Sequence, residues 1–168
     1  GTSAVKYLTT LAGWSMDRAM SSVAIYWGGA MIGRVIFGAI AHRISIIHAF
    51  IVMSTTSALL VLVAFLLGNA VGGYVLLLTG LGNAILYPII FSRSLSIMPE
   101  RASTASAVLV MAGIGGAVIP WLQALIIDYV GLRASFILPI GLYVSLALWG
   151  VLSLQQTRPG VSAPSLTD

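Results

Sequence analysis

The stretch ISIIHAFIVMSTTSALLVLVAFLLGNAVGGYVLLLTGLGNAILYPIIFS, residues 44–92, contains no Asp, Glu, Lys or Arg, and most of it is aliphatic. A soluble protein of 168 residues cannot bury so much apolar surface, so the solvent around this stretch must be lipid. The same texture returns in residues 102–127 and 134–157. We therefore expect an all-α integral membrane protein that crosses the bilayer several times.

The overall composition excludes several other classes of protein. Hydrophobic residues make up 59% of the chain and charged residues only 7%, against roughly 25% charged residues in soluble domains. The net charge of +4 comes from cations scattered along the chain, whereas nucleic-acid binding would need them gathered on one face. Since there is no cysteine, neither a disulfide framework nor thiolate chemistry is expected.

Five apolar stretches are each long enough to cross roughly 30 Å of hydrocarbon as a helix. The connections between them are only a few residues long, so we expect neighbouring helices to be antiparallel. The stretches cover residues 19–41, 44–67, 72–98, 102–127 and 134–154.

The two ends of the chain differ from these spans. Residues 1–8 are too short to span, and we interpret them as the last turns of a truncated transmembrane helix. Residues 9–154 are then a five-helix transmembrane bundle, which begins with a loop over 9–18, and residues 155–168 a disordered cytoplasmic tail. We expect the chain to be the C-terminal piece of a longer protein. A slight excess of arginine favours the cytoplasm for the side that holds the tail.

Arg34 is the most costly residue inside a predicted span. On the lipid face it would cost at least about 2.5–3.5 kcal/mol. It could extend to the membrane surface, or it could face the bundle interior or a wet cavity. Gly28, Gly29, Gly33 and Gly38 would let another backbone approach closely, which favours the interior and a structural or gating role.

The third span carries a polar group near its middle. Asn83 lies there, with Tyr87 one turn later on the same face and Pro88 beside it. Pro88 removes a backbone donor and frees the carbonyl of Ala84. Amide and phenol groups can both donate to and accept from sugar hydroxyls. We predict Asn83 and Tyr87 as substrate contacts, with the alternative that Asn83 only joins two helices.

The fourth span has a weak centre. Gly113, Gly115 and Gly116 lie close together and Pro120 follows. Small residues spaced four apart, such as Ala112 and Gly116, would make a close-packing face. The same run weakens the helix, so we predict a structural or gating role for this segment.

Two further residues are predicted to contact a sugar. Gln123 lies about two turns from the centre of the fourth span, and its amide could bind the polar edge of a pyranose. Trp27, early in the first complete span, could stack on the apolar face of the sugar ring or serve as an interfacial anchor, and the neighbouring Tyr26 allows the same two interpretations.

Residues for enzymatic chemistry are not visible. His42 and His48 are a poor metal pair, and no phosphate-binding loop occurs. We therefore predict no catalytic residue, no metal site, no cofactor and no enzymatic activity. The four carboxylates all lie in predicted loops or at the end of the chain: Asp17, Glu100, Asp128 and Asp168.

Three segments resemble the fucose permease and glucose/galactose transporter branch of the major facilitator superfamily. They are YWGGAMIGR at 26–34, GNAILYPIIFS at 82–92 and VMAGIGGAVIP at 110–120, the last followed by Gln123. They occur in the same order as in that branch, and the resemblance extends over nearly the whole chain. In the loop after the first complete span, His42 stands where the superfamily usually has Asp.

The resemblance implies a C-terminal six-helix half of a twelve-helix fold, with its first helix truncated. It also implies import of a hexose or deoxyhexose (glucose, galactose or fucose) by symport with a proton or sodium ion and by alternating access. The implied partners are the sugar, the coupling ion, the lipid bilayer and the N-terminal half of the same polypeptide, in the bacterial inner membrane.

Two alternatives stay open at this point. An efflux-type permease of the same superfamily would share the fold but need a larger apolar cavity. A non-transporting membrane remnant or scaffold would share the helices without binding a solute.

Overall fold

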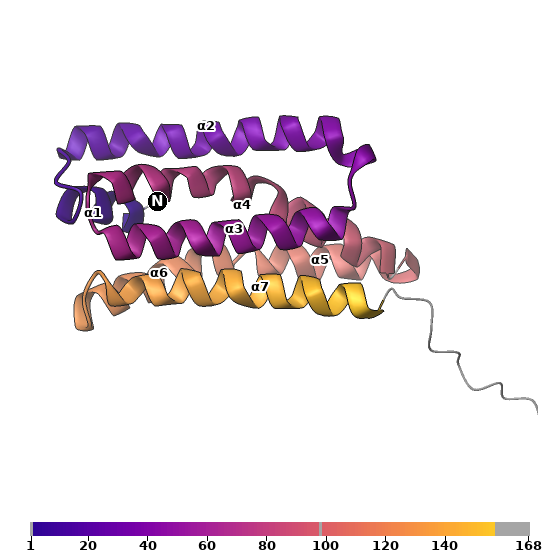
Figure 1. The fold of residues 1–168 in the computed structure, drawn as a ribbon. Coiled ribbons are helices and arrows are strands. Elements are labelled where there is room, and N and C mark those ends of the chain that lie inside the picture. The colour runs from indigo at the N-terminus through magenta and orange to yellow at the C-terminus, as the bar shows by residue number, and fades with distance from the viewer. Residues whose placement is uncertain (1, 98, 157–168) are drawn as a thin grey trace, which may run out of the picture.

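The structure, a computed structural model, describes residues 2–97 and 99–156, and these form helices joined by short turns (Figure 1). These residues contain no strand, so the expected all-α fold is confirmed. The α-helices are α1 Thr2–Thr10, α2 Met16–Ile40, α3 Ile46–Leu67, α4 Ala70–Ile97, α5 Ala102–Ala112, α6 Gly115–Tyr129 and α7 Ile137–Gln156; short 3₁₀ turns are η1 Ala41–Arg43, η2 Pro99–Arg101 and η3 Ala134–Phe136.

The described residues contain five helical stretches long and apolar enough to cross a membrane, as expected. Each corresponds to one predicted span, with ends shifted by a few residues. The stretches are Met16–Arg43, Ile46–Leu67, Ala70–Ile97, Pro99–Tyr129 and Ala134–Leu154.

The loop predicted over residues 9–18 is wrong at both ends. α1 continues to Thr10, and α2 already begins at Met16. Ser15 starts α2 because its side chain accepts a hydrogen bond from the backbone N–H of Arg18, at 3.4 Å. Such a cap satisfies one of the N–H groups that a helix start leaves without a partner.

The predicted tail also begins too early, because Gln155 and Gln156 belong to α7. Residues 157–168 lie outside the described residues, as do Gly1 and Met98, the last residue of the predicted third span. The disorder predicted for the tail therefore stays a prediction.

The predicted fourth span consists of two helices, α5 and α6, rather than one. The backbone tightens between them: the N–H of Gly113 donates to the carbonyl of Val110 at 3.0 Å, and that of Ile114 to Met111 at 2.9 Å. These i→i−3 bonds are of the 3₁₀ type, which often marks a hinge inside a helix. The break occurs at the glycine run that the sequence indicates as weak.

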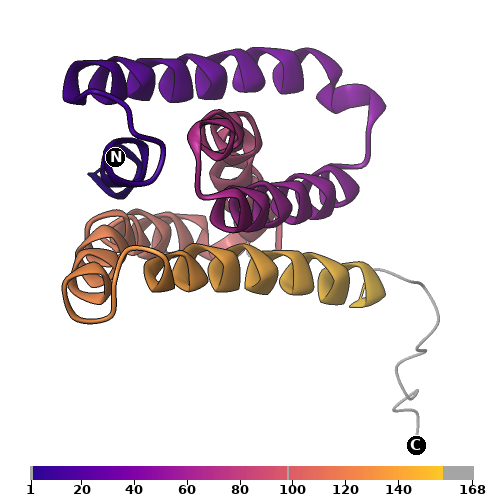
Figure 2. The ribbon, with the colours of Figure 1, turned by 60° about the vertical axis from the view of Figure 1, so that its left-hand side comes forward.

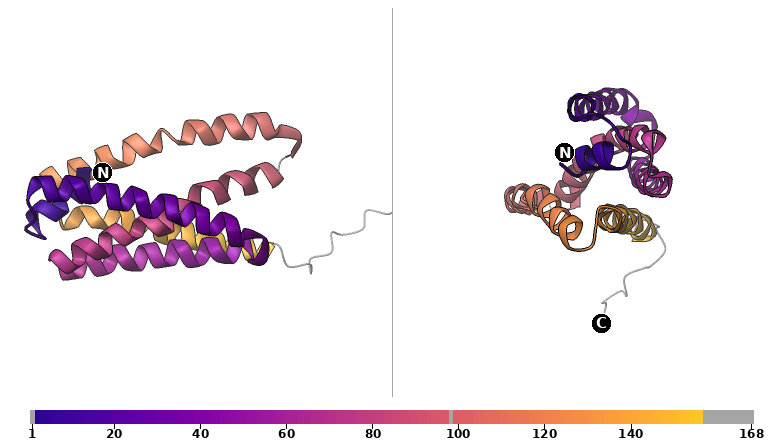
Figure 3. Two further views of the ribbon diagram at one scale, coloured as in Figure 1. Left: turned by 90° about the horizontal axis from the view of Figure 1, so that it is seen from above. Right: turned by 90° about the vertical axis from the view of Figure 1, so that its left-hand side faces the viewer.

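α4 is the central helix of the bundle. It packs between α2 and α3, while α7 packs on α3 from the other side (Figures 1 and 3). α1 lies beside the start of α2 at one end (Figure 2). Seen from above, α5 and α6 lie apart from α2 and α3, at the edge of the bundle (Figure 3). Most residues of α4 that face its neighbours are buried.

Glycines on α4 allow the two neighbouring helices to approach closely. A Cβ added at Gly80 would meet the backbone carbonyl of Tyr26 on α2. One added at Gly82 would meet the hydroxyl of Ser57, a fully buried residue of α3. Since apolar burial does not drive helices together in lipid, such close backbone packing is a main source of their association.

The glycines around Arg34 on α2 divide into two groups. A Cβ at Gly33 would lie 2.9 Å from the carbonyl oxygen of Leu81 on α4, and one at Gly29 would lie 3.7 Å from the Leu81 side chain. At Gly28 and Gly38 an added Cβ would meet no atom within 4 Å. The expected close approach of a second backbone therefore occurs at Gly29 and Gly33 only.

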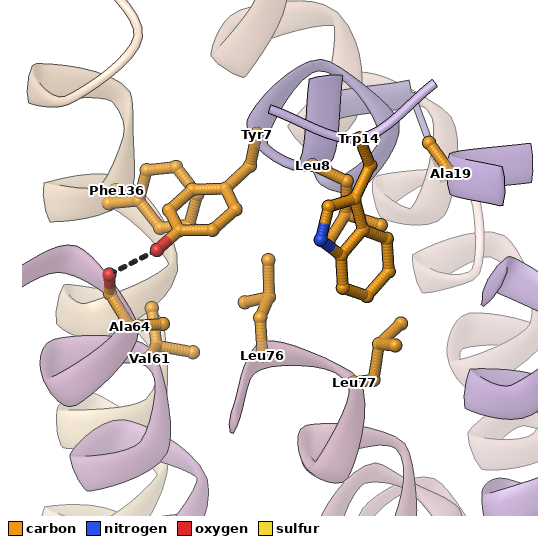
Figure 4. Packing of buried hydrophobic residues seen from close by; sticks show 9 residues of the cluster. All are labelled: Tyr7, Leu8, Trp14, Ala19, Val61, Ala64, Leu76, Leu77 and Phe136. Carbon is orange, nitrogen blue, oxygen red and sulfur yellow. Dashed lines mark hydrogen bonds between the residues drawn. The ribbon is translucent and has the colours of Figure 1, made fainter. Parts of the chain in front are cut away.

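An apolar cluster joins the helices at the end of the bundle where α1 lies (Figure 4). The hydroxyl of Tyr7 donates a hydrogen bond to the carbonyl of Ala64 on α3 at 2.5 Å. Its ring meets that of Phe136 edge to face, with centroids 5.3 Å apart. The cluster consists of Tyr7, Leu8, Trp14, Ala19, Val61, Ala64, Leu76, Leu77 and Phe136.

Gly80→Ala should destabilise the bundle, because the added methyl group would collide with the backbone carbonyl of Tyr26 on α2, which cannot rotate away as a side chain can. Overpacking of this kind costs about 1–3 kcal/mol. The matched control is Gly38→Ala, which adds the same group where no atom lies within 4 Å. Melting temperatures in detergent should fall for the first variant and stay equal or rise for the second. Equal melting temperatures for both would contradict the close α2–α4 packing.

Candidate functional site

A cavity of about 340 Å³ lies between the helices and reaches the centre of α4. Its volume is within the range of small-molecule sites, roughly 300–1,000 Å³. Apolar side chains make up most of its wall, with a few polar groups among them. The lining residues are Ala4, Val23, Tyr26, Trp27, Val61, Leu76, Leu77, Thr79, Asn83, Gly116, Pro120, Gln123, Phe136, Pro139 and Tyr143.

Asn83 connects three helices at the wall of this cavity. Its amide Nδ2 donates to the hydroxyl of Tyr26 on α2 at 2.7 Å. Its Oδ1 accepts from the hydroxyl of Tyr143 on α7 at 2.6 Å. An amide in the middle of a span needs such partners, because hydrocarbon offers none. Asn83 therefore joins helices, and its contact with a solute stays a prediction.

The same hydrogen bonds leave unused groups beside the cavity. Because the Tyr26 hydroxyl accepts from Asn83, its own proton remains available as a donor. Because the Tyr143 hydroxyl donates to Asn83, its oxygen keeps a lone pair that can accept. Asn83 itself retains a second N–H. The cluster can therefore offer both donors and acceptors to one ligand.

Gln123 lies on the wall of the same cavity, although the offset along the spans suggested that it would lie higher than Asn83. Its Nε2 donates to the carbonyl of Ser135 in η3 at 3.4 Å, which leaves its amide oxygen unused by this contact. Gly116 and Pro120, also on α6, line the cavity nearby. Since Pro120 has no N–H, the carbonyl of Gly116 lacks its usual donor within the helix.

Two aromatic residues predicted as sugar contacts have different positions. Trp27 lines the cavity and its ring meets that of Tyr26 edge to face, with centroids 5.5 Å apart. Tyr87 lies away from the cavity, half exposed, and its hydroxyl donates to the carbonyl of Leu109 on α5 at 3.4 Å. The structure therefore does not bring Tyr87 together with Asn83 in one site, and its assignment as a sugar contact stays a prediction.

Arg34 contacts protein beside the cavity rather than lining it. Its Nε donates to the carbonyl of Ala84 at 3.2 Å. This is the carbonyl that Pro88 deprives of its donor within α4. The Arg34 side chain thus bonds to the backbone of the central helix one residue after Asn83.

The glycine run of the fourth span does not form the expected close-packing face. Added Cβ atoms at Gly115 and Gly116 would meet no atom within 4 Å, and Ala112 is exposed. Gly113 lies at the break between α5 and α6, outside the cavity wall. These glycines are therefore places where the backbone tightens and bends rather than contacts between helices in the described residues.

Tyr143 was not predicted as a site residue, and Tyr26 was considered only beside Trp27, as a sugar contact or an interfacial anchor. A phenol inside an apolar span is a usable signal, because its hydroxyl must find a partner in hydrocarbon. Tyr26 also lies next to Trp27 in one of the segments that carry the family resemblance. The pairing of Tyr143 with Asn83, however, depends on how α7 packs, which no local pattern encodes.

Two charged contacts lie at the end of the bundle that holds α1. Lys6 and Asp128 form an exposed ion pair at 3.4 Å. Arg18 on α2 donates from Nη2 to the hydroxyl of Tyr74 on α4 at 2.7 Å, and its guanidinium lies 4.6 Å from the ring centroid of Trp14. Cation–π contacts of this kind add modestly to stability.

Comparison with known proteins decides the family. A Brucella abortus protein named glucose/galactose transporter is 32% identical over 143 residues, which are 85% of this chain and 35% of that relative. The chain belongs to the major facilitator superfamily. A putative glucose/galactose transporter of Helicobacter pylori is 35% identical over 103 residues (61% of this chain, 25% of the relative). The L-fucose-proton symporter of Haemophilus influenzae is 40% identical over 85 residues (47% and 20%).

The chain covers only part of the length of these relatives. The chain spans about a third of the Brucella protein. No family model matches the chain, and no solved structure matches it significantly. The relatives are named as transporters rather than as enzymes, so the chain is a non-enzymatic membrane protein of this superfamily.

Tyr143→Phe should weaken the bundle, because it removes the hydroxyl that donates to Asn83. Hydrogen bonds between membrane helices contribute about 1 kcal/mol. The matched control is Tyr129→Phe, since Tyr129 is 85% exposed at the end of α6. Reversible unfolding in mixed micelles should show a lower free energy of unfolding for Tyr143→Phe only. A loss of similar size at both positions would contradict a specific Tyr143–Asn83 bond.

Proposed function

We propose that this chain is the C-terminal half of a twelve-helix carrier that imports a hexose or deoxyhexose by symport and alternating access. The names of the relatives support a sugar as the solute, and the fucose relative supports a proton as the coupling ion over sodium. The share of the relatives that the chain spans, 35% for the Brucella protein, supports a fragment. The location we propose is the bacterial inner membrane.

The observation that carries this proposal is the Asn83 cluster at the wall of the cavity. Tyr26, Asn83 and Tyr143 present donors and acceptors side by side within a wall that is otherwise mostly apolar. A hexose carries several hydroxyl groups, each of which can both donate and accept. A site with both kinds of group on rigid helices can therefore hold such a solute in one orientation.

Gln123 and Trp27 complete the site in this proposal. Gln123 on α6 lines the same cavity and has an unused amide oxygen. Trp27 offers an indole surface, which suits the apolar face of a pyranose ring. The sugar would thus be held by polar groups along its edge and by an aromatic ring on its face.

The coupling group belongs to another part of the carrier in this proposal. None of the residues lining the cavity is a carboxylate. A proton-linked acid would then lie in the half of the polypeptide outside this chain. For this reason the site is better tested by equilibrium binding than by uptake, since binding needs no ion gradient.

Asn83→Ala and Gln123→Ala in the full-length carrier should each raise the dissociation constant for hexose. Loss of a hydrogen bond between a buried side chain and a sugar hydroxyl costs about 1–3 kcal/mol, or about five- to 150-fold in affinity. The measurement is binding of labelled galactose, glucose and fucose to purified carrier, with folded protein quantified for each variant.

Tyr87→Phe tests the remaining predicted contact: because Tyr87 lies outside the cavity, this change should leave the affinity nearly unchanged, and the prediction of Tyr87 as a sugar contact would then be wrong. If Asn83→Ala and Gln123→Ala lower only the yield of folded carrier, both residues serve helix packing and this site is wrong. A loss of affinity confined to Tyr87→Phe would place the sugar elsewhere.

A further inference from the structure

Pro88 leaves the carbonyl of Ala84 without the N–H that an uninterrupted helix would supply. Arg34 on α2 supplies a donor in its place, with Nε 3.2 Å from the Ala84 oxygen. We propose that Arg34 is a positioning residue: it replaces the hydrogen bond that Pro88 removes from α4, and thereby holds Asn83 at the cavity wall. This inference rests on the proposed sugar site at Asn83.

Arg34 leaves α2 where that helix lies close to α4, so its bond to Ala84 crosses the α2–α4 interface although Arg34 as a whole is exposed. At the neighbouring Gly33, an added Cβ would lie 3.0 Å from the Ala84 side chain and 2.9 Å from the Leu81 carbonyl. The two backbones are therefore in close contact where the Arg34 side chain leaves α2. Ala84 itself is 1% exposed, so its carbonyl has little access to other donors.

α2 holds two consecutive residues of α4. Tyr26 bonds to the Asn83 side chain, and Arg34 bonds to the Ala84 backbone. Without Arg34 the bilayer would offer the Ala84 carbonyl no donor. α4 would then have to rotate or unwind near Pro88 to satisfy it, and Asn83 would move with the backbone.

Arg34 acts through α4 rather than on the solute. It is not among the residues that line the cavity, whereas Asn83 is. A hexose is also uncharged and has no need of a guanidinium counter-charge. The charge instead strengthens the bond to the carbonyl, since hydrogen bonds from an ionised donor are stronger than neutral ones.

The test is a double-mutant cycle between Arg34 and Pro88 in the full-length carrier. Pro88→Ala restores an N–H at position 88, so α4 can satisfy Ala84 by itself. Arg34→Leu should raise the dissociation constant for hexose about tenfold when Pro88 is present. In the Pro88→Ala background Arg34→Leu should raise the dissociation constant less than about twofold. The difference between the two backgrounds then exceeds the roughly twofold deviation from additivity that independent sites show. The melting temperature should show the same dependence on background.

Arg18→Leu is the matched control. Arg18 also joins α2 to α4, through the Tyr74 hydroxyl, but far from Pro88 along both helices. Its removal should have the same effect on melting temperature with Pro88 and with Ala at position 88. A background dependence as large as that of Arg34 would show that Pro88→Ala loosens the whole interface, and would overturn the inference.

Equal losses for Arg34→Leu in both backgrounds would also overturn the inference, because Arg34 would then act without the Ala84 carbonyl. If Arg34→Leu changes neither the affinity nor the melting temperature when Pro88 is present, the inference is overturned as well. Failure of the wild-type carrier to bind any hexose would overturn the proposed function and the positioning of a sugar site. The melting-temperature cycle needs no sugar, so it decides the Arg34–Ala84 contact separately.

Discussion

Hydrocarbon cannot hydrogen-bond a backbone carbonyl, and this constraint governs the centre of the molecule. Pro88 lies inside α4 and leaves the Ala84 carbonyl without a donor. Arg34 on the neighbouring helix provides one. One contact thus accounts for two features that would each be costly alone, a proline inside a span and a cation inside another. The position of α4 between α2 and α3 makes this local contact matter for the whole bundle.

The cavity follows from how the other helices meet α4. Gly80 and Gly82 bring α2 and α3 against its backbone, so the space that remains lies on the side of α6 and α7. Polar groups reach that space only where they also have protein partners, as Asn83 has in Tyr26 and Tyr143. Rigid hydrogen-bonded groups in an apolar wall are the arrangement that small polar solutes require.

The sequence predicted the spans well because length and apolarity determine them almost alone. It also indicated the break at Gly113, since a run of glycines weakens any helix. Pairings across helices were harder to predict. The sequence indicated Arg34 and Ala84 separately but not their contact, which depends on how α2 and α4 are rotated. Helix rotation and packing also determine the role of Tyr143 and the position of Tyr87 outside the cavity. The early start of α2 depends on the Ser15 cap, a local signal that the apolar pattern obscures.

The most direct test is solid-state NMR of the carrier in lipid bilayers, with ¹⁵N at arginine Nε and ¹³C at alanine carbonyls. Comparison with Arg34→Leu assigns the signals of Arg34. We expect a dipolar contact between Arg34 Nε and the Ala84 carbonyl carbon, consistent with the 3.2 Å nitrogen–oxygen distance. A contact of Arg34 Nε with lipid phosphorus, and none with Ala84, would show that the side chain extends to the membrane surface and would contradict the account.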